Sequence, residues 1–296
     1  MHRDNLNNKK YNFDELTQKF EALKPFVFVN EYQTATIDFS NPKAVKALNT
    51  AILYSKYNIN FWEFPDENLC PPIPSRADYV HHLTDLLRRS DINNECNILD
   101  IGTGATCIHP LLGQAINNWK FVGTDISKVS LQIAQKIVDR NNLSKFIKLR
   151  HQKDEDSILK GIIKPEDRFE ASMCNPPFFK SEEEANNATK TKLKGLGKLD
   201  GQVVRNFSGT AKELSYKGGE KAFLHTYLYE STFYKKQCFW YTSLVSNVNH
   251  VRSMQESLKK LGATEVKVVE MIQGNKISRV VAWTFLSKTE QKEWNN

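Results

Sequence analysis

The sequence predicts a doubly wound α/β fold that follows a mostly helical N-terminal segment. Three observations support this fold class. From Asn97 onward, apolar runs of strand length alternate with helical patterns, as they do in sheets built from strand-helix-strand units. The first run, 97–101, leads into a glycine-rich turn, and the second run ends at a carboxylate, Asp125. These last two features are typical of α/β sheets that bind a nucleoside at the carboxyl ends of their strands.

Residues 1–92 form the first predicted unit, a mostly helical segment with loops. Its apolar residues recur at helical spacing near 13–23 and again near 45–54, which indicates two helices packed on a core. Ser75 follows a proline-rich loop and can cap a third helix that reaches about Arg89. We therefore expect this segment to be helical but to lack a regular strand-helix alternation.

Residues 93–296 form the second predicted unit, with six or seven strands. The strands are expected at 97–101, 120–125, 146–150, 169–174, 237–245, 265–272 and 277–285. The helices between them are expected at 106–117, 128–142, 219–235 and, capped by Ser246 and ended by Gly262, at about 247–261. A tight connection through Gly274 and Asn275 predicts a hairpin, so the sheet should end with antiparallel strands.

Composition narrows the class of protein. The net charge of +7 over 296 residues is compatible with a polyanionic partner, although charge alone does not identify one. No run approaches the roughly 18 apolar residues of a membrane span, and the N-terminus has no apolar signal core. We therefore expect a cytoplasmic protein. The five cysteines lie far apart and mostly in apolar runs, which favours reduced core thiols over disulfides or a metal site.

The glycine-rich turn has the spacing Asp100-x-Gly102-x-Gly104. A dinucleotide fingerprint would require glycine or alanine at the third position, where this chain has Cys107. The spacing instead resembles the first motif of the class I S-adenosylmethionine-dependent methyltransferases. Asp125 at the end of the second strand can accept hydrogen bonds from ribose hydroxyls in either class, so it predicts a nucleoside without distinguishing between them.

A second functional stretch, Asn175-Pro176-Pro177-Phe178, ends the fourth predicted strand. Two prolines fix the backbone and make a stiff corner. There the Asn175 amide can donate and accept, the Pro176 carbonyl can accept, and Phe178 offers a flat face. These groups suit a planar ring that carries an amino group. A Pro-Pro turn closing a core strand would account for the same residues equally well.

The two motifs together resemble amino-methyltransferases that act on an exocyclic nitrogen, either adenine N6 or a glutamine amide. Further segments extend the resemblance over nearly the whole chain: His2-Arg3-x-Asn5, Ile101–Gly113, Cys174–Phe179, Gly218-Gly219-Glu220, Trp240–Ser243 and Gln273–Lys276. In combination they are similar to the bacterial 23S rRNA adenine-N6 methyltransferase family. Its eukaryotic relatives, the methyltransferase-like N6-adenosine enzymes acting on U6 small nuclear RNA, share much of the pattern.

The resemblance implies a Rossmann-like class I methyltransferase fold, whose seven-stranded sheet has an antiparallel last strand, with S-adenosyl-L-methionine as cofactor. It implies methyl transfer to N6 of a specific adenine in 23S rRNA, as naked RNA or within an assembling large ribosomal subunit. No obligate protein partner is evident. Cofactor contacts are implied for Arg76 at the methionine carboxylate, Gly102 and Thr106 along the methionine side, Asp125 at the ribose, Gln152 or Asp154 at the adenine, and Asp100 and Gly104 in the turn.

The acceptor base is implied to lie at the stiff corner, with Asn175 and Pro176 holding its amino group and Phe178 stacked on its ring. The segment 180–217 carries eight lysines and arginines. We expect it to be a mobile basic flap over the site, the alternative being a solvated surface loop. RNA contacts are implied for Arg3, Lys10, Phe179, Lys180, Lys276 and Arg279, although core packing is the alternative for Phe179.

Two other functions remain open from the sequence. A protein glutamine amide could occupy the same corner, but Phe178 in place of tyrosine and the basic segment 180–217 disfavour it. An RNA-binding protein that keeps the fold without catalysis is disfavoured because the acidic and glycine residues of the cofactor turn and Asn175 are all retained.

Overall fold

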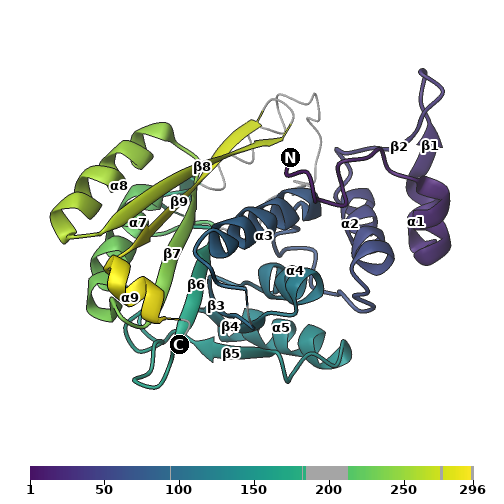
Figure 1. Ribbon diagram of the computed structural model, residues 1–296. Coiled ribbons are helices and arrows are strands. Elements are labelled where there is room, and N and C mark those ends of the chain that lie inside the picture. The colour runs from purple at the N-terminus through teal and green to yellow at the C-terminus, as the bar shows by residue number, and fades with distance from the viewer. Residues whose placement is uncertain (94, 182, 185–212, 274–275, 295–296) are drawn as a thin grey trace.

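The computed structural model describes the whole chain except residues 94, 182, 185–212, 274–275 and 295–296 (Figure 1). Within the described residues, seven strands form one sheet in the order β5-β4-β3-β6-β7-β9-β8. The strands are β3 (Asn97–Ile101), β4 (Lys120–Asp125), β5 (Ile147–His151), β6 (Phe169–Cys174), β7 (Cys238–Val245), β8 (Glu265–Gln273) and β9 (Lys276–Thr284). Strands β3 to β7 pair in parallel, whereas β9 is antiparallel to both β7 and β8. The predicted antiparallel end of the sheet is confirmed.

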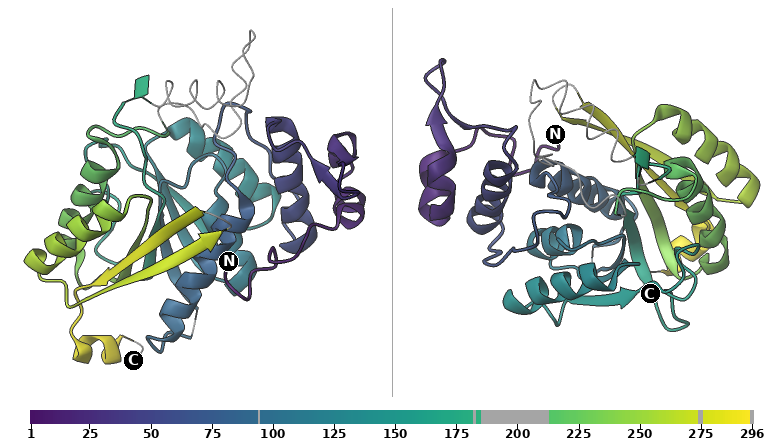
Figure 2. Two further views of the ribbon diagram at one scale, coloured as in Figure 1. Left: turned by 90° about the horizontal axis from the view of Figure 1, so that it is seen from above. Right: turned by 180° about the vertical axis from the view of Figure 1, so that it is seen from behind.

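Helices cover both faces of this sheet (Figures 1 and 2). In Figure 1, α3, α4 and α5 lie on one face, α7 and α8 lie on the other, and α1 and α2 lie outside α3. The helix bounds are α1 (Phe13–Lys19), α2 (Pro42–Lys56), α3 (Ile73–Arg88), α4 (Ile108–Asn117), α5 (Lys128–Arg140), α7 (Gly219–Ser231), α8 (Val248–Leu261) and α9 (Lys288–Glu293), with 3-10 turns η1 (Glu21–Phe26) and η2 (Thr232–Tyr234).

The sheet has its switch point between β3 and β6. After β3 the chain builds β4 and β5 outward on one side, and then returns to add β6 on the other side of β3. In the register of this pair, Ile101 lies opposite Cys174. Gly102 and Asn175 therefore leave neighbouring strand ends at the crevice where doubly wound sheets bind ligands.

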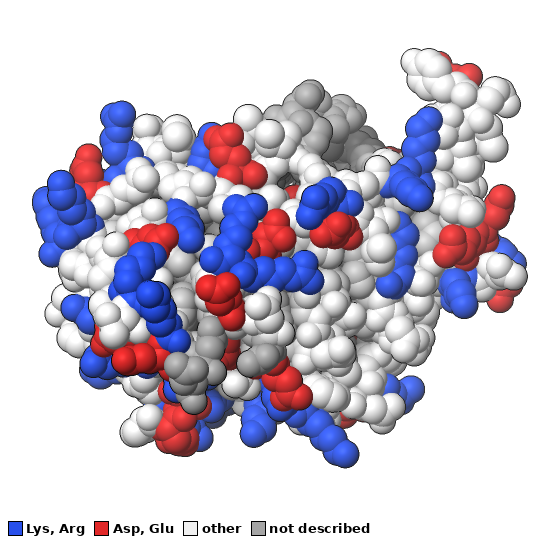
Figure 3. Space-filling view, in the orientation of Figure 1, with Lys and Arg blue, Asp and Glu red and all other residues white. Residues whose placement is uncertain are grey.

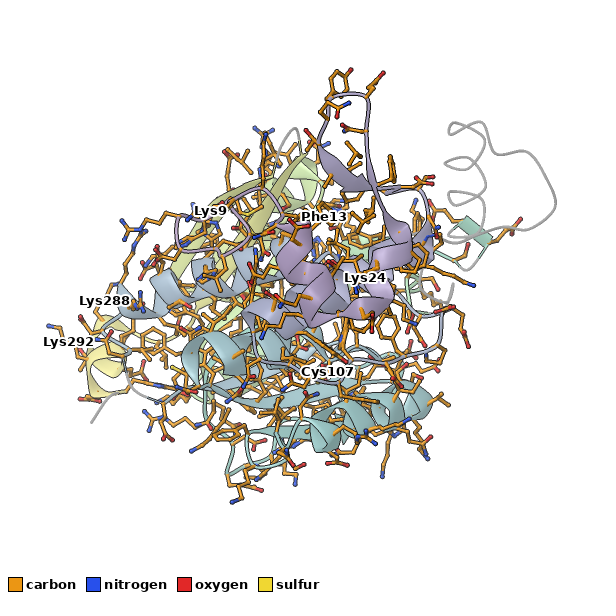
Figure 4. All side chains as sticks on the ribbon, turned by 90° about the vertical axis from the view of Figure 1, so that its right-hand side faces the viewer. Lys9, Phe13, Lys24, Cys107, Lys288 and Lys292 are labelled. Carbon is orange, nitrogen blue, oxygen red and sulfur yellow. The ribbon has the colours of Figure 1, made fainter. Side chains whose placement is uncertain are left out.

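The N-terminal segment and the sheet share one hydrophobic core. Along β3, Ile98 packs into a cluster that also contains Phe13, Trp62 and Cys107, whereas Leu99 packs into a second cluster on the α7 and α8 face. This alternation follows from the two-residue period of a strand. Figure 4 labels two members of the first cluster, Phe13 on α1 and Cys107. Residues 1–92 are thus packed onto the sheet and do not form a separate core.

Two predicted helix caps are wrong. Helix α3 begins at Ile73 after Pro72, with no side-chain cap, so Ser75 lies inside its first turn. Pro74 is tolerated there because the first backbone N–H groups of a helix have no partner within the helix. Helix α8 is capped by Asn247, whose side chain accepts from the Asn249 N–H. Ser246, the predicted cap, bonds instead to the carboxylate of Glu220.

The N-terminal segment also contains a hairpin that the helical prediction missed. Strands β1 (Val27–Val29) and β2 (Ala35–Ile37) pair antiparallel. Three residues are too few to produce an alternation that can be recognised in a sequence.

The predicted state of the cysteines is confirmed, since all five are free thiols and four of them are buried. Burial raises the pKa of both Cys96 and Cys107 to about 12, so these thiols are unreactive at neutral pH. No helix of the described part is long and apolar enough to cross a membrane.

Candidate active site

A cavity opens at the switch point of the sheet, with about 1340 Å³ of space when the solvent at its mouth is included. Its walls come from the ends of β3, β4 and β6, from loop 69–71 and from segments 152–158 and 213–216. The cavity brings together nine residues predicted from the sequence: Arg76, Gly102, Gly104, Thr106, Asp125, Gln152, Asn175, Pro176 and Phe178. The cavity therefore brings the predicted cofactor side and the predicted acceptor side of the site together.

The turn after β3 depends on its two glycines. Gly102 and Gly104 have φ angles of +72° and +62°, a conformation that costs glycine little and other residues more. The N–H groups of Gly102 and Thr103 both donate to the carbonyl of Thr124, each at 2.9 Å. The turn is thus bonded to the neighbouring strand, and its glycines leave open space in front of the backbone.

The third position of this motif lies behind the turn, away from the cavity. Cys107 has a φ of 51° at the start of α4 and is completely buried in the core. Trp62 of the N-terminal segment donates from Nε1 to the carbonyl of Thr106 at 3.0 Å. A residue of the first predicted unit therefore fixes the turn of the second, a contact that the sequence did not reveal.

Asp125 ends β4 and faces the cavity. Its Oδ2 accepts from the Gly104 N–H at 2.9 Å, and its Oδ1 accepts from the Ser127 N–H at 2.8 Å. Burial raises its pKa to about 6, although these two bonds act in the opposite direction. The carboxyl group is thus mostly ionised at neutral pH and retains lone pairs for further donors such as ribose hydroxyls.

Arg76 is half-buried in the cavity wall. Burial lowers the pKa of its guanidinium to about 10, partly opposed by the nearby Asp100 carboxylate, so it stays cationic at neutral pH. Asp100 itself is fully buried and does not line the cavity. Its Oδ1 lies 3.0 Å from Nδ1 of His109, a buried residue that lines the cavity and for which the sequence predicted no role in the site. The arrangement leaves a cationic fork facing the cavity above a buried carboxylate, which suits an anionic ligand group.

The segment after β5 separates the two alternatives for the adenine side. Gln152 lines the cavity and is buried. Its Nε2 donates to the carbonyl of Lys160 at 2.9 Å, and its Oε1 accepts from the Asp154 N–H at 3.0 Å. The side chain of Asp154 accepts from the Ser157 hydroxyl at 2.8 Å and does not line the cavity. Of the two predicted residues only Gln152 lines the cavity, and its side-chain amide is bonded within its own segment.

The segment after β5 is held by Glu230 of α7. The sequence predicted no role for this residue. Its buried carboxylate accepts from the N–H groups of Ile158, Leu159 and Lys160 at 2.6 to 3.1 Å. A carboxylate surrounded by backbone donors is a strong and directional support. The wall formed by 157–158 is thereby fixed to α7.

The stiff corner after β6 presents its groups to the same cavity. Asn175 is half-buried, and within the described residues its amide has no hydrogen-bond partner. Pro176 is buried, whereas 40% of the Phe178 side chain is exposed. The N–H groups of Phe178 and Phe179 both donate to the carbonyl of Leu214 at 3.0 Å, and the Phe179 carbonyl accepts from the Tyr216 N–H at 3.0 Å. The corner is therefore held by the backbone of the segment that returns to it.

The predicted RNA-contacting residues do not gather in the cavity. Phe179 is half-buried and belongs neither to the cavity lining nor to a core cluster. Lys180, Arg3 and Lys10 are exposed, and Arg279 pairs with Glu270 at 3.2 Å. Lys276 begins β9, but its side chain and residues 185–212 of the predicted flap lie outside the described residues. On the face shown in Figure 3, Lys and Arg are interspersed with Asp and Glu.

The start of the N-terminal arm is packed onto α3. The backbone N–H of buried His2 bonds to Asp78, and the Asn5 amide donates to the carbonyl of Pro74 at 2.9 Å. Arg3, between them, points outward with 87% of its side chain exposed. The arm thus has a structural role, while the exposed Arg3 lies with its Nε 3.8 Å from Oδ1 of Asp4.

The parallel sheet with its antiparallel end is the fold of a class I S-adenosylmethionine-dependent methyltransferase, and its cavity lies at the switch point between the glycine-rich turn, Asp125 and the Asn-Pro-Pro-Phe corner. Residues 1–287 match the RNA methyltransferase family. The chain belongs to this family.

Relatives and solved structures agree with this assignment. Ribosomal RNA large subunit methyltransferase F of Flavobacterium johnsoniae is 46% identical, covering 99% of this chain and 96% of the relative. The protein of the same name from Bacteroides fragilis is 45% identical, covering 96% and 98%. The catalytic domain of human Mettl16 in complex with MAT2A 3'UTR hairpin 6 is similar with a TM-score of 0.80 and 29% identity, covering 97% of this chain and 98% of that one. The N-terminal domain of human METTL16 in complex with SAH has a TM-score of 0.77 and 28% identity, covering 97% and 99%.

Proposed function

We propose that this protein transfers a methyl group from S-adenosyl-L-methionine to N6 of a specific adenine in large-subunit ribosomal RNA. The observation that carries the proposal is the amide of Asn175, which lines the cavity beside the cofactor turn and has no hydrogen-bond partner in the part of the chain that the structure describes. The names of the Flavobacterium and Bacteroides relatives support large-subunit ribosomal RNA as the substrate. Because that RNA is made in the bacterial cytoplasm, the proposal includes this compartment.

The charged and polar groups that line the cavity suit the charged and polar parts of S-adenosylmethionine. When bound, this cofactor supplies an electrophilic methyl group on its sulfonium. Arg76 would pair with the carboxylate of its methionine part, and the Gly102 to Thr106 turn would receive the methionine chain against open backbone. Asp125 would accept from the ribose hydroxyls, and Gln152 would lie at the adenine.

The acceptor nitrogen is a poor nucleophile because its lone pair is conjugated with the adenine ring. Asn175 Oδ1 and the Pro176 carbonyl would accept the two N6 hydrogens, which favours a pyramidal nitrogen whose lone pair is available for attack. Phe178 would stack on the base once it has left its paired or stacked context. Catalysis then depends mainly on holding the acceptor nitrogen and the sulfonium methyl group in the geometry of attack. No general base is needed before transfer, since the N6 proton becomes acidic only after the new N–C bond has formed.

The decisive experiment incubates the protein with methyl-labelled S-adenosylmethionine and either total RNA or ribosomal subunits that lack the modification. We expect label in N6-methyladenosine after digestion of the RNA to nucleosides, and no label with Asn175→Ala. Label in another nucleoside would disprove the N6 assignment. Label in protein would favour glutamine-amide transfer, and tight RNA binding without label would favour the non-catalytic alternative.

A further inference from the structure

The segment that returns to the stiff corner, residues 213–216, also reaches the N-terminal segment. Glu213 lines the cavity. Its Oε1 accepts from the Asn68 side-chain amide at 2.7 Å, and its Oε2 accepts from the Leu69 N–H at 3.3 Å. One carboxylate therefore accepts hydrogen bonds from both a side chain and the backbone of a loop in the N-terminal segment. Asn68 of this loop lies 145 positions before Glu213 in the sequence.

The loop that donates these two hydrogen bonds, which contains Asn68 and Leu69, is itself fixed. Asn49 of α2 is buried, and its amide donates to the carbonyl of Pro71 at 3.3 Å and to Sγ of Cys70 at 3.4 Å. Leu69 and Pro71 line the cavity. Glu213 is thus tied to a loop that is anchored on a core helix.

Glu213 is also followed in the sequence by Leu214, the residue that holds the corner. The carbonyl of Leu214 accepts from both Phe178 and Phe179. A shift of Glu213 would move Leu214, and with it the ring of Phe178 and the groups that precede it. The N-terminal segment also holds the cofactor turn, through the bond from Trp62 to Thr106. The same segment therefore contacts both halves of the cavity.

We propose that Glu213 is a positioning residue, which sets the distance between the acceptor corner and the cofactor turn by tying residues 213–216 to Asn68 and Leu69. This inference rests on the proposed function. Glu213 acts through the corner and performs no chemical step. A displacement of about 1 Å at a reacting centre can cost up to about a hundredfold in rate, so loss of these bonds should lower kcat while leaving the cofactor contacts intact.

The test compares variants in single-turnover methylation at saturating cofactor and RNA, with cofactor Kd measured separately by calorimetry. We expect Glu213→Ala to lower the rate about tenfold, with cofactor Kd changed less than threefold. Glu213→Gln keeps an oxygen that can accept from Asn68 and should recover most of the rate. Glu256→Ala, which removes an exposed carboxylate of α8, is the matched control and should behave as the wild type.

A double-mutant cycle separates positioning from a general structural effect. Asn68→Ala should lower the rate in the wild-type background and add less than twofold in the Glu213→Ala background. Independent, additive effects of the two substitutions would overturn the inference, as would a weaker cofactor Kd with an unchanged saturated rate. If the wild-type protein transfers no methyl group, the proposed function fails. If it does and Glu213→Ala has the wild-type rate, only this inference fails.

Discussion

The cofactor turn and the acceptor corner lie on neighbouring strands, but they are held in different ways. The turn is bonded to the next strand of the same unit: Gly104 donates to Asp125, 21 positions away. The corner is bonded to Leu214, and the adjacent Glu213 reaches Asn68 across 145 positions. A local motif, supported by the long-range bond from Trp62 to Thr106, thus builds one half of the site, whereas the other half depends on tertiary contacts.

This difference predicts how the two halves respond to substitution. Changes at the turn and at Arg76 should act mainly on cofactor affinity, because those groups are proposed to contact the cofactor before any reaction. Changes at the corner should act mainly on the rate, because its groups are proposed to contact the acceptor nitrogen. Four substitutions or titrations test this division.

The largest effect is expected for Asn175→Ala. Removing the amide that holds the acceptor nitrogen should lower kcat on the order of a thousandfold, as the loss of a positioned hydrogen-bonding group does in other enzymes. Cofactor Kd should stay within a few-fold, since Arg76 and Asp125 are unchanged. Single-turnover methylation and calorimetry measure the two quantities. A large loss of cofactor binding would show that the two halves are not separable.

Arg76→Met should produce the opposite pattern. It keeps the length of the side chain but removes the charge that faces the cavity, and a charge-assisted bidentate pair contributes about 1.5–3 kcal/mol. Cofactor Kd should therefore rise by about tenfold to a hundredfold, with most of the rate recovered at saturating cofactor. Arg88→Met, in the last turn of the same helix, is the control. Unchanged cofactor binding in Arg76→Met would assign another role to this residue.

Phe178→Ala removes the ring proposed to stack on the acceptor base. Stacking of a base on an aromatic side chain contributes about 1–3 kcal/mol, so kcat/KM for RNA should fall by about tenfold. Phe178→Trp should retain activity because it preserves a flat face. Steady-state kinetics with varied RNA would measure both variants, and equal losses in the two would argue against stacking.

The smallest effect is a pH dependence of cofactor binding. Asp125 has a pKa raised to about 6 by burial in the ligand-free protein. Ribose hydroxyls donate to the ionised carboxylate, so binding favours the charged form and cofactor affinity should fall as the pH decreases through 6. The expected change between pH 7.5 and 5.5 is about fourfold. Asp125→Asn should bind more weakly and remove this dependence, and a wild-type affinity that does not vary with pH would contradict the assigned contact.

Most of the fold was predictable because periodicity and turn residues report on local structure. Strands β3, β4 and β6 have the predicted bounds. The caps predicted at Ser75 and Ser246 were wrong because several adjacent residues can begin each helix. Helix α3 begins two residues before Ser75, where its proline is tolerated, and the neighbouring Asn247 caps α8. Ser246 instead donates a hydrogen bond to the buried carboxylate of Glu220, a contact that no local sequence pattern predicts.

The same reasoning separates the predictable from the unpredictable parts of the site. Gly102, Gly104 and Asp125 were found because their spacing follows from the geometry of one strand-turn-helix unit. Glu213 and His109 were missed because each acts through a partner that is distant in sequence or buried beneath the cavity. A lone glutamate in a lysine-rich segment, or a histidine in an apolar helix, carries no local signal of such a role.

Helix α7 constrains how this enzyme can change during evolution. At its start, Gly219 has a φ of +72° and lies so close to Lys180 that a Cβ would approach the lysine side chain to 2.9 Å. Near its end, Glu230 holds the wall at 157–158. Inserting or deleting one residue between these points would rotate one end by about 100° relative to the other. Length changes in α7 should therefore be far rarer among functional descendants than changes of side chain.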